Sequence, residues 1–108
     1  MFSGDFAVGE KIQNSFNKAG GAASPEETKA LLQQLAEQVA KVAEKLPEEK
    51  AAEVADDLER FTEEATKDNP RRKWWELSAE GIREAAESVG TAGTTVISLL
   101  EKLGGLLE

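Results

Sequence analysis

The chain has 108 residues, of which 21 are acidic and 13 are basic, and it contains neither histidine nor cysteine. The length suits one domain, and 40% hydrophobic residues are enough to build a core. The missing residue types exclude a classical zinc finger, a thiolate nucleophile, a Ser-His-Asp triad and a disulfide framework. The net charge of -8 opposes binding to phosphate backbones, which draws on clustered Lys and Arg, so we expect no nucleic-acid partner.

The N-terminal segment 1–23 differs in composition from the rest of the chain. Its large apolar residues alternate with glycine and asparagine, which is not typical of a helix. We predict an irregular or short β arm here. A two-stranded ribbon is marginal on its own, so the arm needs a surface on its own helices or on a neighbouring copy. The apolar residues in question are Phe2, Phe6, Val8, Ile12 and Phe16.

A helix start follows the arm. Ser24 is placed as an N-cap, Pro25 as the first helical residue, and Glu27 as the reciprocal partner of a capping box. We predict a helix over residues 25–46. Its apolar residues are spaced 3, 4, 3, 4, the pattern of a helix that packs at a shallow angle against another; they are Leu32, Leu35, Val39, Val42 and Leu46.

Pro47 ends this helix and can open the next one, which we predict over residues 47–68. The second helix repeats the same spacing at Ala51, Val54, Leu58, Phe61 and Ala65. Two helices of about 20 residues joined by almost no loop satisfy both apolar seams only by folding back on each other. The sequence therefore predicts an antiparallel αα-hairpin.

One or two further helices are expected at the C-terminus. We predict a short helix over residues 70–76 and a longer one over 78–104, which a Gly-Gly pair should stop. Gly90 and Gly93 lie inside the longer helix and indicate a bend, a break or a close approach by another backbone. The predicted fold is thus all-α, with a helical bundle domain over residues 24–108 and the arm beside it.

Pairs of carboxylates one turn apart, such as Glu49 and Glu53, have the spacing that a metal site in a bundle would use. A di-iron site also needs histidine and inward-facing acids, whereas these acids lie off the apolar seam. Nothing places two acids in an apolar setting where their pKa values would separate. We therefore predict no catalytic residue, no cofactor and no metal site, and not an enzyme.

The cluster Arg71-Arg72-Lys73-Trp74-Trp75 is the most distinctive local feature. Structural packing of the tryptophans is favoured over a protein interface, and stacking on nucleic-acid bases is opposed by the surrounding negative charge. Neighbours on a helix point about 100° apart, so both rings can be buried only if a second surface is available. This geometry indicates a partner.

The sequence as a whole favours a non-enzymatic helical interaction or self-assembly module with a protein partner, most simply another copy of the chain. The residues expected at the contacts are Phe2, Phe6, Val8, Ile12, Phe16, Trp74, Trp75, Leu100 and Leu103. The alternative is a membrane-active toxin or pore-forming subunit in which the arm and the last helix rearrange at a bilayer. Membrane contact is not favoured, because the last apolar segment is too short to span and carries only Lys102 beside its apolar face.

The N-terminus lacks the basic region and apolar run of a secretory signal, so we expect a cytoplasmic location.

Residues 69–90, NPRRKWWELSAEGIREAAESVG, carry Asn-x-x-Arg before an aromatic pair, then Ser-x-x-Gly and Ala-Ala-x-x-Val-Gly. This pattern, with the Gly4-Asp5-Phe6 element upstream, resembles a helical tail of bacterial conflict-system and signalling proteins. The resemblance covers about two thirds of the chain and rests on packing motifs. It implies a non-enzymatic module that assembles or recruits, often attached to ATPase, peptidase or TIR-type effectors, and it implies no active site.

Overall fold

The computed structural model describes the backbone of residues 3–108 and the side chains of residues 7–108, and within this range every regular element is a helix. The all-α class is therefore confirmed. The elements are α1 (Ser3–Gly20), α2 (Glu26–Glu44), α3 (Glu48–Ala65), α4 (Arg72–Ser88), the 3-10 helix η1 (Gly90–Gly93) and α5 (Thr94–Leu107).

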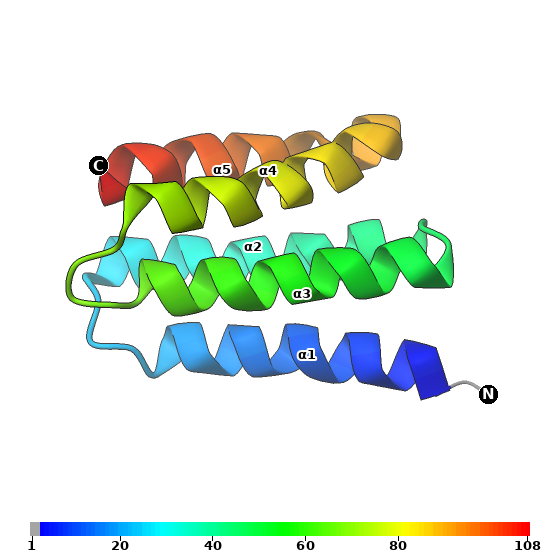
Figure 1. The fold of residues 1–108 in the computed structure, drawn as a ribbon, viewed down its shortest axis with the longest axis horizontal. Coiled ribbons are helices and arrows are strands. Elements are labelled where there is room, and N and C mark those ends of the chain that lie inside the picture. Colours follow the sequence, from blue (N-terminus) through cyan, green and yellow to red (C-terminus); the bar gives the residue numbers. More distant parts are fainter. Residues whose placement is uncertain (1–2) are drawn as a thin grey trace.

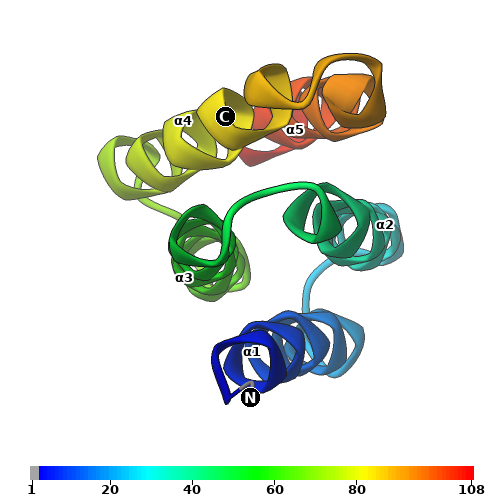
Figure 2. The same ribbon diagram turned by 90° about the vertical axis from the view of Figure 1, so that its right-hand side faces the viewer.

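The helices form three layers, which Figure 2 shows end-on. α2 and α3 make the central layer, α1 covers one of its faces, and α4 and α5 cover the other. α3 contacts α4, α2 contacts α5, and α4 and α5 contact each other. The connections between consecutive helices alternate between the two ends of the molecule (Figure 1).

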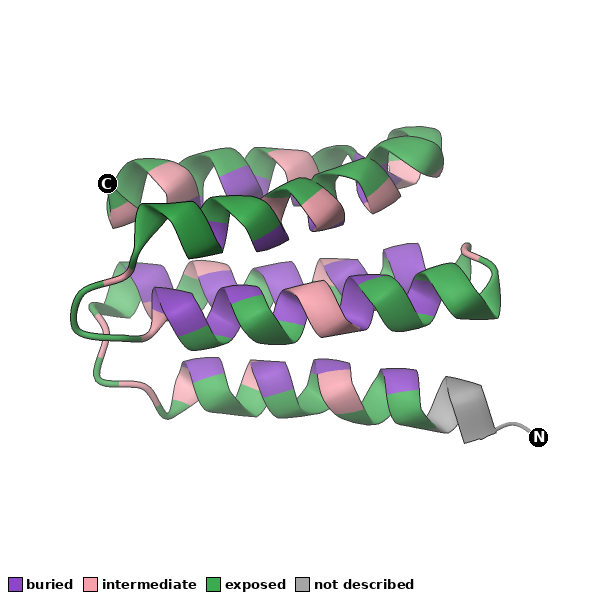
Figure 3. Ribbon diagram, in the orientation of Figure 1, coloured by how far each residue is buried: buried purple, intermediate pink, exposed green. Residues whose placement is uncertain are grey.

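The core runs between the layers, on the sides of the helices that face their neighbours (Figure 3). The seam residues predicted on α2 and α3 are buried there, except for Leu46, which lies half-buried in the turn between them. The largest fully buried side chains come from four helices and include Leu35, Leu58, Phe61, Ile82 and Leu103. α2 and α3 thus supply apolar surface to both outer layers.

The prediction of an irregular or β arm was wrong, because residues 3–20 form helix α1. Its buried side chains are Val8, Ile12, Ser15 and Ala19, spaced 4, 3 and 4, which is one helical face. Asn14 and Asn17 are exposed on the outside. Packing on α2 and α3 therefore outweighs the low helix propensity of the glycines and asparagines.

Two prolines set the starts of α2 and α3. Pro25 and Pro47 stand immediately before the first helical residue, and their carbonyl oxygens accept the first bonds, from Lys29 N at 3.0 Å and Ala51 N at 2.8 Å. Neither start has a side-chain cap, so the predicted Ser24 cap with its Glu27 box was wrong. The ring of proline already holds the φ angle that the first turn requires.

α4 is one continuous helix through the boundary predicted at residue 77. The hydroxyl of Ser78 donates back to the carbonyl oxygens of Trp74 and Trp75, each at 3.2 Å, and does not cap a new helix. The predicted helices over 70–76 and 78–104 are therefore wrong in their boundaries, since the real break falls after Ser88.

The break has two glycines with different roles. Gly90 has a φ of 69°, in the left-handed region that glycine adopts most readily. Gly93 is buried so tightly that a Cβ there would overlap the backbone of Ala86. Both a break and a close approach thus occur here. The predicted stop at the Gly-Gly pair was wrong: α5 continues through Gly104 and Gly105 to Leu107, and Gly104 packs beside the ring of Trp75.

Replacing Gly93 by alanine should destabilise the fold by about 1–3 kcal/mol, because the added methyl must displace backbone. Gly105→Ala is the matched control: nothing lies within 4 Å of its added Cβ, and alanine favours the helix by about 0.5–1 kcal/mol. Urea unfolding followed by circular dichroism checks both changes. Equal midpoints for the two variants would contradict the close packing of Gly93.

Candidate functional site

Most of the residues expected at partner contacts lie in the chain's own core. Val8, Ile12, Trp75, Leu100 and Leu103 are each at most 9% exposed. Phe16 is half-buried against the same core. Phe2 and the side chain of Phe6 lie outside the described residues. Of the predicted set, Trp74 is the described residue that reaches the surface, with 45% of its area exposed.

The adjacent tryptophans separate as the helix geometry requires. The ring of Trp75 is buried, whereas the ring of Trp74 projects outward beside α3. The Arg71 guanidinium lies 5.8 Å and the Lys73 ammonium 5.4 Å from the centroid of the Trp74 ring. Cations at these distances attract the face of an indole, so they favour a fixed position for the exposed ring.

Leu77 is the residue that the sequence analysis missed. Leu77 is 65% exposed and lies almost one turn from Trp74. Both residues line a hollow of about 340 Å³ between α3 and α4. The signal was available: in a continuous α4 the buried stripe is Trp75, Ser78, Ile82 and Ala86, and Leu77 falls off that stripe. The supposed helix boundary at residue 77 concealed it.

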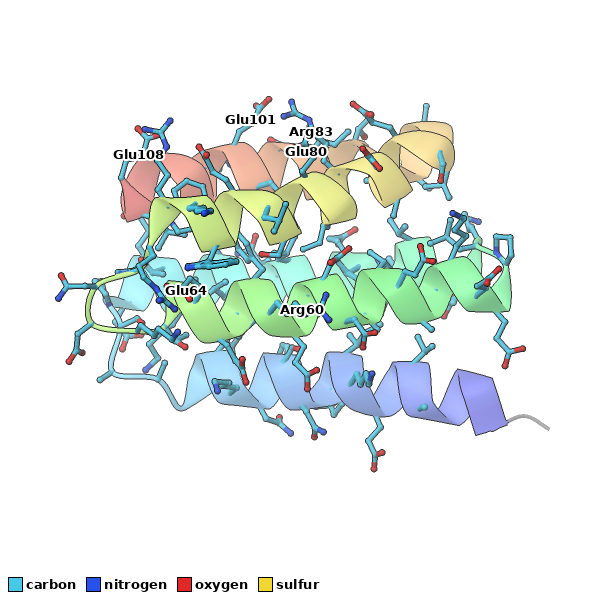
Figure 4. All side chains as sticks on the ribbon, viewed as in Figure 1. Arg60, Glu64, Glu80, Arg83, Glu101 and Glu108 are labelled. Carbon is cyan, nitrogen blue, oxygen red and sulfur yellow. The ribbon has the colours of Figure 1, made fainter. Side chains whose placement is uncertain are left out.

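Most charges on α4 are already paired within the chain. Arg72 binds Glu76 at 2.7 Å and Glu108 at 3.4 Å. Arg83 lies 3.8 Å from Glu87 and 3.6 Å from Glu101, and Figure 4 shows Arg83 and Glu101 together above the outer layer. The contacts with Glu101 and Glu108 tie α4 to the C-terminal segment, whereas the other two lie within α4.

Lys73, Glu80 and Glu84 make no ion pair with any described side chain. At 3.6 residues per turn, they share with Leu77 an arc of about 60° on the outside of α4. Together with Trp74, these residues form what we call the α4 surface: Lys73, Trp74, Leu77, Glu80 and Glu84.

A buried carboxylate fixes the start of α4. Glu64, whose side chain is 6% exposed, accepts hydrogen bonds from Arg71 N at 2.8 Å, Arg71 Nε at 3.1 Å and Lys67 Nζ at 2.9 Å. These donors lower the pKa of Glu64 to about 2. The Glu64 carboxylate therefore holds the α3–α4 turn (Figure 4), and with it the backbone that carries Trp74.

The carboxylate of Asp57 has fewer favourable contacts than that of Glu64. Asp57 presses against Gly81 of α4, and its side chain is 24% exposed. Desolvation raises the pKa of Asp57 above its usual value, and Arg60, at 3.8 Å, opposes this rise. Among the described side chains, no three acidic residues converge as a metal ion would require. Asp57 is thus a partly desolvated carboxylate between two helices, and Arg60 offsets its desolvation only in part.

None of the described helices combines the length and the apolarity needed to cross a bilayer.

Glu64→Gln should lower the stability at about pH 7 and flatten its pH dependence. A carboxyl group whose pKa is lower in the folded chain contributes stability above its unfolded value of 4.5, and loses it as the pH falls toward about 2. The urea midpoint of the variant should therefore lie below that of the wild type at neutral pH, with the gap closing in acid. Glu63→Gln is the control, because Glu63 is exposed and 3.9 Å from Lys18. A difference in urea midpoint that stays the same in acid would contradict a stabilising role for the ionised Glu64 carboxylate.

Asp57→Asn should have the opposite effect and raise the urea midpoint at about pH 7. Because the pKa of Asp57 is raised by folding, its ionised form costs stability above the unfolded value of 3.8, and the cost disappears below it. The gain should therefore fade as the pH drops below about 4. Asp56→Asn removes the partner of Lys11 and should give no gain. Destabilisation by Asp57→Asn at neutral pH would show that the carboxylate contributes favourably.

No protein-family model, no curated protein and no solved structure matches this chain.

Proposed function

We propose that this chain is a non-enzymatic helical module that acts in the cytoplasm by binding protein, in the first place other copies of itself. One observation carries the proposal: Trp74 and Leu77 stand exposed less than one turn apart on α4. Large aromatic side chains in well-ordered surroundings are the residues that protein interfaces most often use as anchors. In this proposal the antiparallel αα-hairpin of α2 and α3 is the scaffold, and α4 is the binding helix.

The anchoring of Trp74 supports the proposal. Arg71 is bonded to Glu64 through both its backbone and its side chain, and the Arg71 guanidinium in turn lies near the Trp74 ring. A side chain that is already ordered loses less conformational entropy when a partner binds. The ring is therefore suited to act as an anchor before any partner arrives.

The resemblance of residues 69–90 to tails of bacterial conflict-system and signalling proteins covers the whole of α4. We propose accordingly that the module serves a bacterial defence or signalling system by assembling or recruiting. The surface that would do so lies within the segment that carries the resemblance.

Leu77→Glu should abolish self-association, because it places a charge where apolar surface would be buried. The wild-type mass, measured by size-exclusion chromatography with light scattering, should rise with concentration into the high micromolar range, and that of the variant should stay monomeric. Leu106→Glu is the matched control, since Leu106 is also exposed but lies at the end of α5.

A wild type that stays monomeric at every concentration would refute self-assembly. Loss of association in both leucine variants would show that the contact is not specific to α4. Dye release from anionic vesicles by the wild type would instead favour the membrane-active alternative.

A further inference from the structure

We propose that the occupant of the α4 surface is the α4 helix of a second copy, docked antiparallel across a two-fold axis that passes near Leu77. This inference rests on the proposed function, which names another copy as the first partner, and adds which helix of that copy docks and in which orientation. It starts from the charges on α4 that make no ion pair with any described side chain: Lys73 lies on the N-terminal side of Leu77, and Glu80 and Glu84 lie on its C-terminal side.

The positions along the helix match across such an axis. At a rise of about 1.5 Å per residue, Lys73 lies about 6 Å before Leu77, and Glu80 lies about 4.5 Å after it. In an antiparallel pair centred on Leu77, the level of Lys73 in one copy therefore differs from the level of Glu80 in the other by only about 1.5 Å along the helix axis. Because of the two-fold axis, this pairing of Lys73 with Glu80 occurs twice in the dimer. Glu84 lies one helical turn beyond Glu80 in each copy.

The parallel arrangement is disfavoured by the same charges. Two α4 helices aligned in parallel would set Lys73 against Lys73 and Glu80 against Glu80, and like charges at these positions repel. Charge complementarity thus selects the antiparallel arrangement. An interface of this kind is isologous, because the same patch serves on both copies.

The contact is small. One helix against one helix buries well under the about 1,600 Å² of a standard interface, so the association should be weak and visible at high micromolar concentration. Weak association makes the paired charges decisive for orientation.

A charge reversal tests the inference. Lys73→Glu and Glu80→Lys should each weaken dimerisation about tenfold, as each variant sets like charges opposite each other twice. The double variant Lys73→Glu with Glu80→Lys restores opposite charges and should recover most of the lost association. Sedimentation velocity over a concentration series measures the dissociation constants, and circular dichroism checks that each variant is folded. Lys41→Glu is the matched control: Lys41 is an exposed lysine on α2, away from α4.

The outcomes separate this inference from the proposed function. If Leu77→Glu prevents association but the double variant is no better than the single ones, α4 remains the binding helix and the two-fold antiparallel arrangement is overturned. If Lys41→Glu weakens dimerisation as much as Lys73→Glu, only net charge matters, and the inference is likewise overturned. A monomeric wild type refutes both.

Discussion

The structure depends on a central pair of helices that is apolar on two sides. The buried apolar residues of α3 spread over about 120° of its circumference, from Phe61 to Ala55, and α2 behaves similarly. A pair of helices with such broad apolar surfaces stays exposed to water if only one face is covered. α1 and the α4–α5 pair therefore have to lie on opposite faces, and the three-layer arrangement follows from this requirement.

The same requirement explains which parts of the fold could be predicted. The apolar seams of α2 and α3, and the proline before each helix, are local sequence patterns that do not depend on what packs outside them. The sequence of α1 shows no comparably strong helix signal, because its glycines and asparagines have low helix propensity. α1 is helical because the packing of Val8, Ile12 and Ala19 on the open face of α2 and α3 stabilises it. Knowledge of that open face requires the fold.

The candidate site likewise has one part that the sequence predicts and one part that depends on the fold. The expectation that Trp74 and Trp75 point in different directions needed only the helix geometry, and it is correct. That Lys73, Glu80 and Glu84 make no ion pair with a described side chain depends on which acids Arg72 and Arg83 reach, and those include Glu101 of α5 and Glu108 just after it. The sequence shows seven charged residues on α4 but not which of them form ion pairs in the folded chain.

The break after α4 connects the fold to the surface. Had the helix continued past Ser88, Val96, Leu100 and Leu103 would extend away from the bundle, whereas in the structure they are buried against it. Gly90 reverses the chain and Gly93 permits the close contact with Ala86, so α5 returns beside α4 on the side of α2. With α3 and α5 as its main neighbours and α1 on the far face, the outer side of α4 is left uncovered. The glycines that allow the core to close thus also determine which helix face stays available for a partner.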